Sequence, residues 1–547
     1  MVTRSTFICG WSYRGKVTAE ATCCREMPMT ARTPTIPEES KGLPMTAKWD
    51  PEKLAQEERF LQELEKKSLW ERIRGYAKLT GPAWLQSAMT LGAGSATASV
   101  MAGASFGYKL LWVQPLAMFL GVMIFAALAK VVLTTGERPY RAFGRELHPI
   151  IPLFWAVGTI VASIIWHFPQ YTLAGAAAWD LAQVAQSAIV GKPDPGKTAP
   201  VENNQAKQPL PSVSSTGNAP KWMEYGVKYG IALCILAINI FTVWNYGSHT
   251  RGIKLYEGFL RWVIRIVILA FLAVVIWTGI RWGELVRGFF GFYVPDTPDG
   301  VTVVLGALGA AVGINMTFLY PYSILAKGWG KYHKGLAKWD LFSSMFLPYT
   351  IVTSLIIIAM ANTIYDGKDV VRTGLQPVQA AAAFSTLLHS DLGRVILDLG
   401  FLAMTCGAIS THMVVCGFTW CEMLGLEYTR QRFRLFSLTP AIGILGAGMG
   451  YPFWMPILAS AICLTMLPLV YLAIFLMANK KSYLGDAVGS GPARWIFNLL
   501  LLAAITVTTI GTAVQIKVRV VDPVRKLLNP PAAANQAAPS QEKPKSP

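Results

Sequence analysis

The segment AMTLGAGSATASVMAGASFGYKLLWV, residues 88–113, carries no charge before Lys109 and places Gly92-Ala93-Gly94-Ser95 in its middle. Glycine is the weakest helix former after proline, so we expect a membrane-spanning helix to open at this point. Unwound backbone frees carbonyl and amide groups that lipid cannot satisfy. Such backbone survives only where it is buried in protein or lines a water-filled cavity. The segment therefore predicts a broken helix beside a cavity.

The composition extends this interpretation to the whole chain of 547 residues, of which 53% are hydrophobic and only 15% charged. A soluble domain is about a quarter charged. Apolar runs of the length that crosses a bilayer as a helix recur along the chain. We predict an all-α integral membrane protein with about 11 transmembrane helices. Their expected limits are 82–103, 108–133, 150–182, 224–247, 253–278, 301–324, 338–361, 392–423, 435–451, 454–478 and 494–515.

The formal net charge of +18 comes from Lys and Arg residues that cluster in alternate loops between the apolar runs. This is the positive-inside pattern of membrane proteins, and it argues against nucleic acid as a partner. It predicts a multi-pass protein of the cell membrane, embedded in the lipid bilayer, with a cytoplasmic N-terminus. An odd number of spans places the C-terminus outside. The clusters lie at 138–145, 251–254, 327–338, 430–434 and 480–481.

The domain organisation follows from the same patterns. Residues 1–49 form an expected disordered N-terminal tail, in which Met27, Met29 and Met45 are alternative starts. A charged amphipathic helix on the cytoplasmic surface is expected over 50–78. The remaining expectations are a first transmembrane repeat at 79–278 with a disordered outside loop at about 191–221, a second repeat at 301–478, an additional transmembrane helix at 494–515, and a C-terminal tail at 516–547 that is disordered from about 530.

A second glycine-rich interruption, LGALGAAVGINMTF at 305–318, lies in the sixth expected span. The two interruptions occupy the first spans of two five-span halves. Interrupted segments at matching positions indicate the binding site of an inverted-repeat transporter. The alternative is close helix packing through small residues. A nucleotide-binding interpretation of GAGSAT is weaker, because the third glycine and the flanking βαβ unit are missing.

The run GPAWLQSAMTLGAGSATASVMAGASFGYKLLWV, residues 81–113, resembles the first span of the Nramp family (natural resistance-associated macrophage proteins, proton-coupled divalent-metal transporters). The similarity extends to LYEGFLRWVIRIVILAFL at 255–272, to GFLAMTCGAIST at 400–411 and to SAICLTMLPLVYLAIFLMANKKSYLGD at 460–486. It covers about 79–515. The resemblance implies the LeuT-type five-plus-five inverted repeat of that family. The matching positions of the first span are Gly81, Pro82, Leu85, Ser87, Gly94, Thr97 and Gly103.

The chain departs from the family at the positions that bind metal. The family's first-span motif Asp-Pro-Gly-Asn aligns with Gly92-Ala93-Gly94-Ser95, so its carboxylate is missing. The sixth-span motif Met-Pro-His-Asn aligns with Asn315-Met316-Thr317-Phe318, although an alignment shifted by two residues stays open. The tenth-span glutamine aligns with Met466. The third span carries His167 and Gln170 where the family has acidic proton-relay residues.

The expected binding site is neutral, because no Asp or Glu lies near either interruption and no carboxylate ligand for a metal can be assigned. It consists of freed carbonyls and polar side chains. This set suits a monovalent ion, a hydrated ion similar to Mg²⁺, or a polar neutral solute. The predicted substrate- or ion-binding residues are Gly92, Ala93, Gly94, Ser95, Asn315, Thr317 and Met466.

Several ionisable residues fall within the predicted spans. His167 and His412 could titrate near neutral pH and couple transport to protons. The alternative is a pair of neutral histidines that are hydrogen-bonded across helices. Asp180 and Asp398 are expected near span ends, where water solvates them.

The function that the sequence predicts is an Nramp-like secondary transporter, which moves a small metal ion of altered selectivity by alternating access. No cofactor is expected, and an enzyme is disfavoured because no catalytic pair stands out. Two alternatives stay open: a transport-inactive sensor or scaffold with this fold, and a transporter of a non-metal solute. The sequence determines neither the ion nor the oligomeric state.

Overall fold

The computed structural model describes residues 51–79, 81–190, 220–246, 250–372, 375, 380–381, 391–450, 454–517 and 521. The chain divides into two units, Met1–Glu39 and Ser40–Pro547, and every described residue belongs to the second unit. The predicted N-terminal tail, most of the predicted loop at 191–221 and the predicted C-terminal tail from about 530 lie outside the described residues.

Eight segments of the described chain are long and apolar enough to span a membrane. Along each unbroken helix the backbone groups are satisfied within the helix, which is what a lipid environment requires. The helices that form them are α5 (Val113–Thr135), α7 (Ile150–Val190), α8 (Lys221–Tyr246), α9 (Thr250–Thr278), α11 (Pro298–Ala311) with α12 (Ile314–Ala326), α13 (Lys334–Asp340) with the π-helix η3 (Leu341–Phe346) and α14 (Leu347–Thr363), α16 (Leu392–Met423) and α21 (Pro492–Ile516).

The first and tenth predicted spans are each interrupted in the middle. The first consists of α3 (Ala83–Thr90) and α4 (Ala93–Phe106), and the tenth of α18 (Trp454–Leu464) and α19 (Leu467–Asn479). The break in the first span falls within the predicted interruption. The break between α11 and α12 likewise falls within the predicted interruption of the sixth span.

The ninth span differs from the predicted α-helix at 435–451. It consists of the short helix α17 (Arg430–Ser437) and the 3₁₀-helix η4 (Thr439–Gly448). Pro440 has no backbone N–H to donate. Gly443 lies so close to α7 that a Cβ would come within 2.3 Å of the His167 Cβ, and one on Gly446 within 2.4 Å of the Phe168 carbonyl oxygen. Close backbone packing against α7 therefore replaces regular α-helix here.

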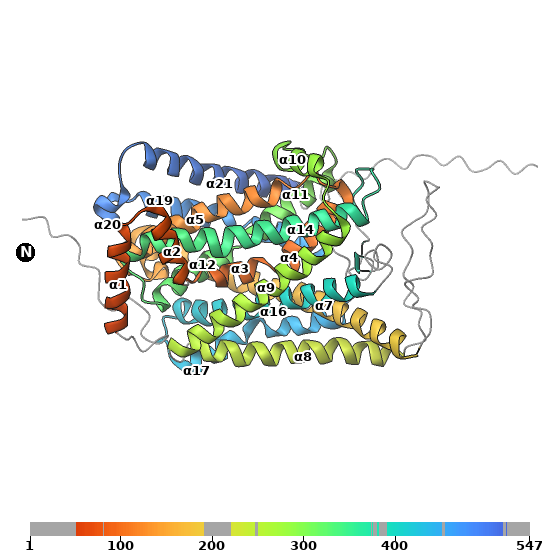
Figure 1. The fold of residues 1–547 in the computed structure, drawn as a ribbon. Coiled ribbons are helices and arrows are strands. Elements are labelled where there is room, and N and C mark those ends of the chain that lie inside the picture. The colour runs from red at the N-terminus through yellow and green to blue at the C-terminus, as the bar shows by residue number, and fades with distance from the viewer. Residues whose placement is uncertain are drawn as a thin grey trace, which may run out of the picture. The chain divides into compact units, whose positions relative to one another are not determined.

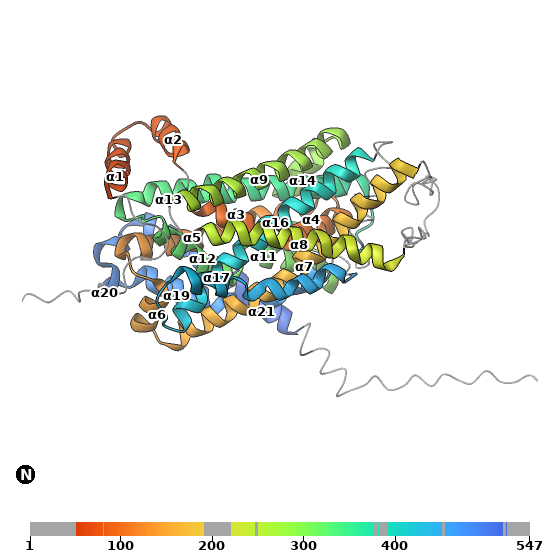
Figure 2. The same ribbon diagram turned by 90° about the horizontal axis from the view of Figure 1, so that it is seen from below.

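The two interrupted first spans lie in the interior of the helical bundle (Figures 1 and 2). Every residue of α4 and of α12 is buried. α4 packs against α11, α14 and α18, whereas α12 packs against α5 and α7. By contrast, only 33%, 39% and 28% of the apolar windows of α8, α9 and α21 are buried, so these helices form the outer faces of the bundle.

Short helices lie at the two ends of the bundle (Figure 1). The predicted single helix at 50–78 is two helices, α1 (Pro51–Glu65) and α2 (Leu69–Lys78). They are separate because Ser68 and Glu71 form a capping box that starts α2. α20 (Lys481–Leu484) lies at the same end, and α10 (Trp282–Phe290) lies at the opposite end. The other short elements are α6 (Pro139–Glu146), η2 (Lys331–His333) and η5 (Gly485–Val488).

Candidate functional site

The first helix break opens the backbone at Gly92, which is extended with φ −137° and ψ −164°. The Ala93 N–H donates to Gln170 Oε1 on α7 at 2.9 Å. The Ser95 hydroxyl donates to the Gly92 carbonyl at 3.2 Å and accepts from the Gly92 N–H at 3.3 Å. Side chains thus satisfy groups that the interrupted helix leaves free, as buried polar groups require.

The second break has the same form at Gly313, which is extended with φ −102° and ψ 160°. Its N–H donates to the Met316 thioether at 3.3 Å. Asn315 uses both ends of its amide: Oδ1 accepts from the Met316 N–H at 3.0 Å, and Nδ2 meets Nδ1 of His412 at 2.9 Å. The start of α12 is therefore fastened to α16 through a neutral amide and an imidazole.

A small, partly open cavity lies between the two breaks, and the empty space there, together with the adjoining open solvent, is about 320 Å³. The Thr90 hydroxyl at the end of α3 lies within hydrogen-bonding distance of the carbonyls of Ala310 (3.1 Å) and Ala311 (2.7 Å), so it joins the two breaks across the cavity. Among the residues that the structure describes, the lining has no acidic or basic side chain apart from one histidine. The lining residues are Met89, Thr90, Gly92, Gly94, Ser95, Trp166, Gln170, Gly309, Ala310, Gly313, Asn315, Met316 and His412.

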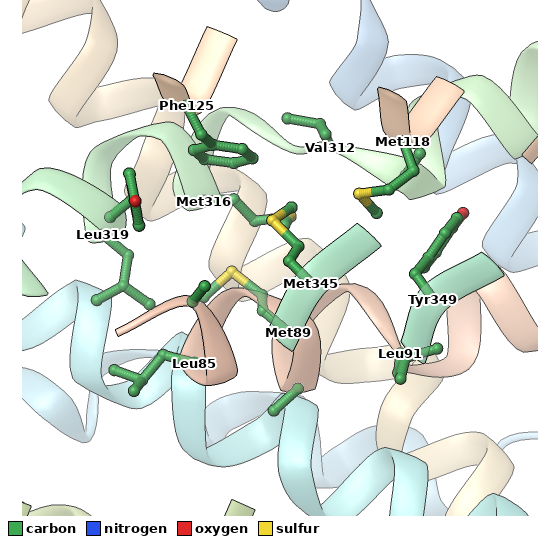
Figure 3. Packing of buried hydrophobic residues seen from close by; sticks show 14 of the residues in the cluster. Leu85, Met89, Leu91, Met118, Phe125, Val312, Met316, Leu319, Met345 and Tyr349 are labelled. Carbon is green, nitrogen blue, oxygen red and sulfur yellow. The ribbon is translucent and has the colours of Figure 1, made fainter. Parts of the chain in front are cut away.

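The cavity has two kinds of lining. Met89 and Met316 belong to an apolar cluster in which their side chains lie near that of Met345 (Figure 3). The other lining groups include amides, hydroxyls and an imidazole. A ligand in this cavity therefore meets polarisable sulfur on one side and neutral hydrogen-bonding groups elsewhere.

Of the nine residues predicted to bind substrate or couple protons, five line the cavity: Gly92, Gly94, Ser95, Asn315 and His412. The structure places the other four elsewhere. Among the described residues, the lining includes none of Ala93, Thr317, Met466 and His167.

Hydrogen bonds explain why Thr317 does not face the cavity. Its hydroxyl donates to the Ile314 carbonyl at 2.6 Å and accepts from the Trp155 indole N–H at 2.9 Å. Met466 caps the start of α19, and its terminal methyl lies where a Cβ on Gly158 of α7 would meet it at 3.3 Å. Both residues thus serve helix packing in this structure.

His167 lies behind the cavity and is fully buried. Its ring meets the His412 ring edge-on, with 5.5 Å between the centroids. Nδ1 lies 2.6 Å from the Pro440 carbonyl oxygen and Nε2 lies 3.2 Å from that of Ile409. Both neighbours are acceptors. A neutral imidazole has one N–H and satisfies one of them, whereas a protonated ring donates to both.

Sequence reasoning named Gln170 as a polar candidate but missed Met89, Thr90 and Trp166 in the cavity lining. Gln170 is recognisable because an amide in mid-span needs a partner. Methionine and tryptophan give no such signal in an apolar run. Trp166 is nevertheless tightly placed, because a Cβ on Gly94 would lie 2.6 Å from its ring.

Polar contacts hold the first span at both of its ends. The Asp340 carboxylate accepts from the N–H groups of Gly81 at 3.2 Å and Ala83 at 2.8 Å, at the start of α3. At the far end of α4, the Arg372 side chain donates from Nε to the Ala104 carbonyl at 3.0 Å. The backbone N–H of Arg372 donates to the Ser105 hydroxyl at 3.2 Å. The cavity thus lies between two fastened ends.

Comparison with known proteins gives a consistent result. The model of the family described as natural resistance-associated macrophage protein-like matches residues 223–515. The chain is 23% identical over 455 residues to the divalent metal cation transporter MntH of Brucella suis, covering 80% of this chain and 87% of the relative. It is 20% identical over 450 residues to MntH of Bacillus subtilis, covering 80% and 92%.

Solved structures show the same fold. A mutant of the manganese transporter of Eremococcus coleocola superimposes with a TM-score of 0.59 at 13% identity, covering 91% of this chain and 94% of that one. The same transporter bound to an aromatic bis-isothiourea compound gives a TM-score of 0.55 at 13% identity, with coverages of 85% and 90%. At this identity the likeness concerns the fold, and it confirms the predicted fold class.

Proposed function

Because the chain belongs to the Nramp family, we propose that it is a secondary transporter that moves a metal ion across the membrane by alternating access. The ion binds in the cavity between the two helix breaks. The observation that carries this proposal is the meeting of both breaks at one cavity, whose lining includes neutral hydrogen-bonding groups. The names of the MntH relatives, which are divalent metal cation transporters, support a metal as substrate.

The cavity lining favours a selectivity that differs from that of a carboxylate site. A bare divalent ion among neutral dipoles would keep poorly compensated charge at low dielectric. Mg²⁺ sheds its water reluctantly, so a hydrated ion can use amides and hydroxyls such as those of Gln170, Asn315 and Ser95 as hydrogen-bonding partners. A hydrated, Mg²⁺-like divalent cation is therefore the proposed substrate. The thioethers of Met89 and Met316 would instead favour a softer ion that binds without its water.

The two histidines are the proposed proton-coupling residues. His412 lines the cavity and contacts Asn315, while His167 contacts His412 from behind. A proton gained by His167 satisfies both facing carbonyls and adds positive charge next to the cavity. This charge would oppose a bound cation, so proton and metal would favour different states of the site.

Alternating access requires the polar contacts at the two ends of the first span to break in turn. Opening on the side of α3 breaks the contacts of Asp340 with Gly81 and Ala83. Opening at the far end of α4 breaks the contacts of Arg372 with Ala104 and Ser105. Each set is small enough to break without unfolding the bundle.

The test is uptake into proteoliposomes of the purified protein, across Mn²⁺, Mg²⁺, Ca²⁺, K⁺ and Na⁺, with internal pH recorded in parallel. We expect saturable Mg²⁺ uptake that Ser95→Ala and Asn315→Ala weaken and that Thr302→Ala, on α11 outside the cavity lining, leaves unchanged.

Two other outcomes would redirect the proposal. Strong Mn²⁺ uptake would show that the missing carboxylate does not decide selectivity. An absence of flux for every ion, from protein shown to be folded, would favour a polar organic substrate or a sensor with this fold.

A further inference from the structure

A charged cluster joins α7 to α16 away from the cavity. Asp180, Arg394 and Asp398 have exposed fractions of 0%, 2% and 1%. Arg394 Nε donates to Asp180 Oδ2 at 2.6 Å, and a second guanidinium nitrogen donates to Oδ1. The prediction that water solvates Asp180 and Asp398 near span ends was wrong, because these side chains are buried between two helices.

Asp398 lies one turn after Arg394 on α16, and its carboxyl group lies within hydrogen-bonding reach of the Asp180 carboxyl group. Within the described residues, neither Asp398 oxygen accepts a hydrogen bond from a donor. The cluster therefore places two carboxyl groups beside one guanidinium, and Asp180 already occupies that guanidinium with both of its oxygens.

Electrostatics does not allow both acids to stay ionised. Two carboxylates that share a buried site repel each other, and a buried carboxylate without a donor loses its solvation with no compensation. The charged groups of the described chain that act on Asp398 are Asp180 and Arg394. The nearby cation of α8, Lys228, is paired with Glu224 instead.

A single proton resolves this conflict. It converts the Asp398 carboxylate into a carboxylic acid, which removes the surplus negative charge. The new O–H group donates to the Asp180 carboxylate and so satisfies both acids.

The cluster is separate from the cavity. Asp180 follows Gln170 by ten residues on α7, about 15 Å along the helix axis. Asp398 precedes His412 by fourteen residues on α16, about 21 Å along the axis. Both lie toward the end of α7 that leads into the predicted outside loop.

We propose that Asp180, Arg394 and Asp398 form a proton-binding site, in which Asp398 carries the proton and donates it to Asp180. Release of the proton leaves one uncompensated negative charge between α7 and α16. That charge favours a state in which water reaches this end of the interface, so proton release is linked to opening there. The site stands independently of the proposed metal transport.

Infrared spectroscopy of the purified full-length protein at neutral pH tests the site without any transport measurement. A protonated carboxylic acid has a carbonyl stretch that a carboxylate lacks. We expect Asp398→Asn to remove one such band. The control Asp299→Asn changes an exposed carboxylate in the first turn of α11 and should leave the band in place.

A second variant keeps the test decisive if Asp398→Asn does not fold. Asp180→Asn leaves Asp398 as the acid beside Arg394, so Asp398 should ionise and the same band should disappear. A carbonyl spectrum that neither variant changes would mean that Asp398 is ionised in the native protein, and the proposal would be overturned.

Discussion

The cavity between the helix breaks and the Asp180–Arg394–Asp398 cluster are both buried, but they use opposite kinds of chemistry. The cavity is lined by neutral amides, hydroxyls, thioethers and one imidazole. The cluster holds two acids and a guanidinium within a few ångströms. The difference shows that this chain keeps full charges where helices are joined and neutral dipoles where a ligand is proposed to exchange.

The free-energy cost of burying charge explains why the cluster is charged and the cavity is neutral. A buried ion pair stays favourable only when its geometry is fixed, because the desolvation cost is repaid by close contact. A transport site must bind and release, so it works against such a fixed arrangement. Freed backbone groups and neutral side chains give weaker contacts that a hydrated ion can exchange for water.

The largest expected effect comes from breaking the charged cluster. Arg394→Ala leaves two buried acids without their cation, and breaking such a pair costs about 3–5 kcal/mol. Thermal unfolding in detergent should show a clearly lower Tm. Arg287→Ala, which removes an exposed arginine of α10, should change stability by less than about 0.5 kcal/mol. Equal Tm values for the two variants would show that Arg394 contributes no more to stability than an exposed arginine does.

The next effect concerns the space at the first break. A Cβ on Gly92 would lie 2.7 Å from Gln170 Nε2 and 2.8 Å from the Ala408 Cβ. Gly92→Ala therefore overpacks the break, at a cost of about 1–3 kcal/mol. Uptake should fall. The control is Gly330→Ala, because a Cβ added there would meet no described atom within 4 Å, and this variant should keep wild-type uptake. Wild-type uptake by the Gly92→Ala variant would show that the break tolerates an added methyl group.

A carboxylate placed in the cavity sharpens the comparison directly. Asn315→Asp keeps an oxygen for the Met316 N–H and replaces the amide nitrogen that meets His412. A full negative charge should favour a bare divalent ion, and a gain of about 1.4 kcal/mol would raise Mn²⁺ uptake relative to Mg²⁺ roughly tenfold. The ratio of initial uptake rates measures this. An unchanged ratio would mean that charge at this position does not control selectivity.

The smallest effect lies in a loop beyond α14. Asp369 accepts from Lys109 Nζ at 2.6 Å, Tyr365 OH at 2.9 Å and Tyr293 OH at 3.0 Å. Burial alone would raise the pKa of Asp369, but these donors lower it below its usual value. The stabilisation is therefore present above the unfolded-state pKa of about 3.9 and is lost as pH falls through the folded-state pKa.

Because exposed ion pairs contribute about 0–1 kcal/mol, only a small part of the wild-type stability should depend on Asp369. The difference in Tm between wild type and Asp369→Asn should shrink as the pH falls from 7 to below about 4. A difference that stays constant with pH would contradict the role given to this carboxylate.

The sequence predicted both helix breaks because the glycines at Gly92–Gly94 and near Gly313 can be recognised from the local sequence alone. Asn315 and His412 were found for a similar reason, since polar side chains in mid-span stand out. Thr317 and Met466 also looked suitable, but their contacts with Trp155 and α7 depend on packing between distant spans. Local sequence carries no information on such contacts.

The burial of Asp180 and Asp398 also depends on contacts between distant spans, which the local sequence does not reveal. Asp180 and Arg394 are 214 positions apart, and nothing near either residue reveals the other. The proximity of each acid to a span end therefore suggested solvation, although the fold buries the pair. Likewise, an apolar run at 435–451 predicted a span, but its form as a 3₁₀-helix depends on close contact with α7.

The central claim, that a neutral cavity carries the substrate, is tested most directly by competition between metals. Proteoliposomes with the wild-type protein would take up Mg²⁺ in the presence of an equal concentration of Mn²⁺. The account predicts that Mg²⁺ uptake continues with little inhibition, because no carboxylate favours the bare transition-metal ion. Strong inhibition by Mn²⁺, together with rapid Mn²⁺ uptake, would contradict it.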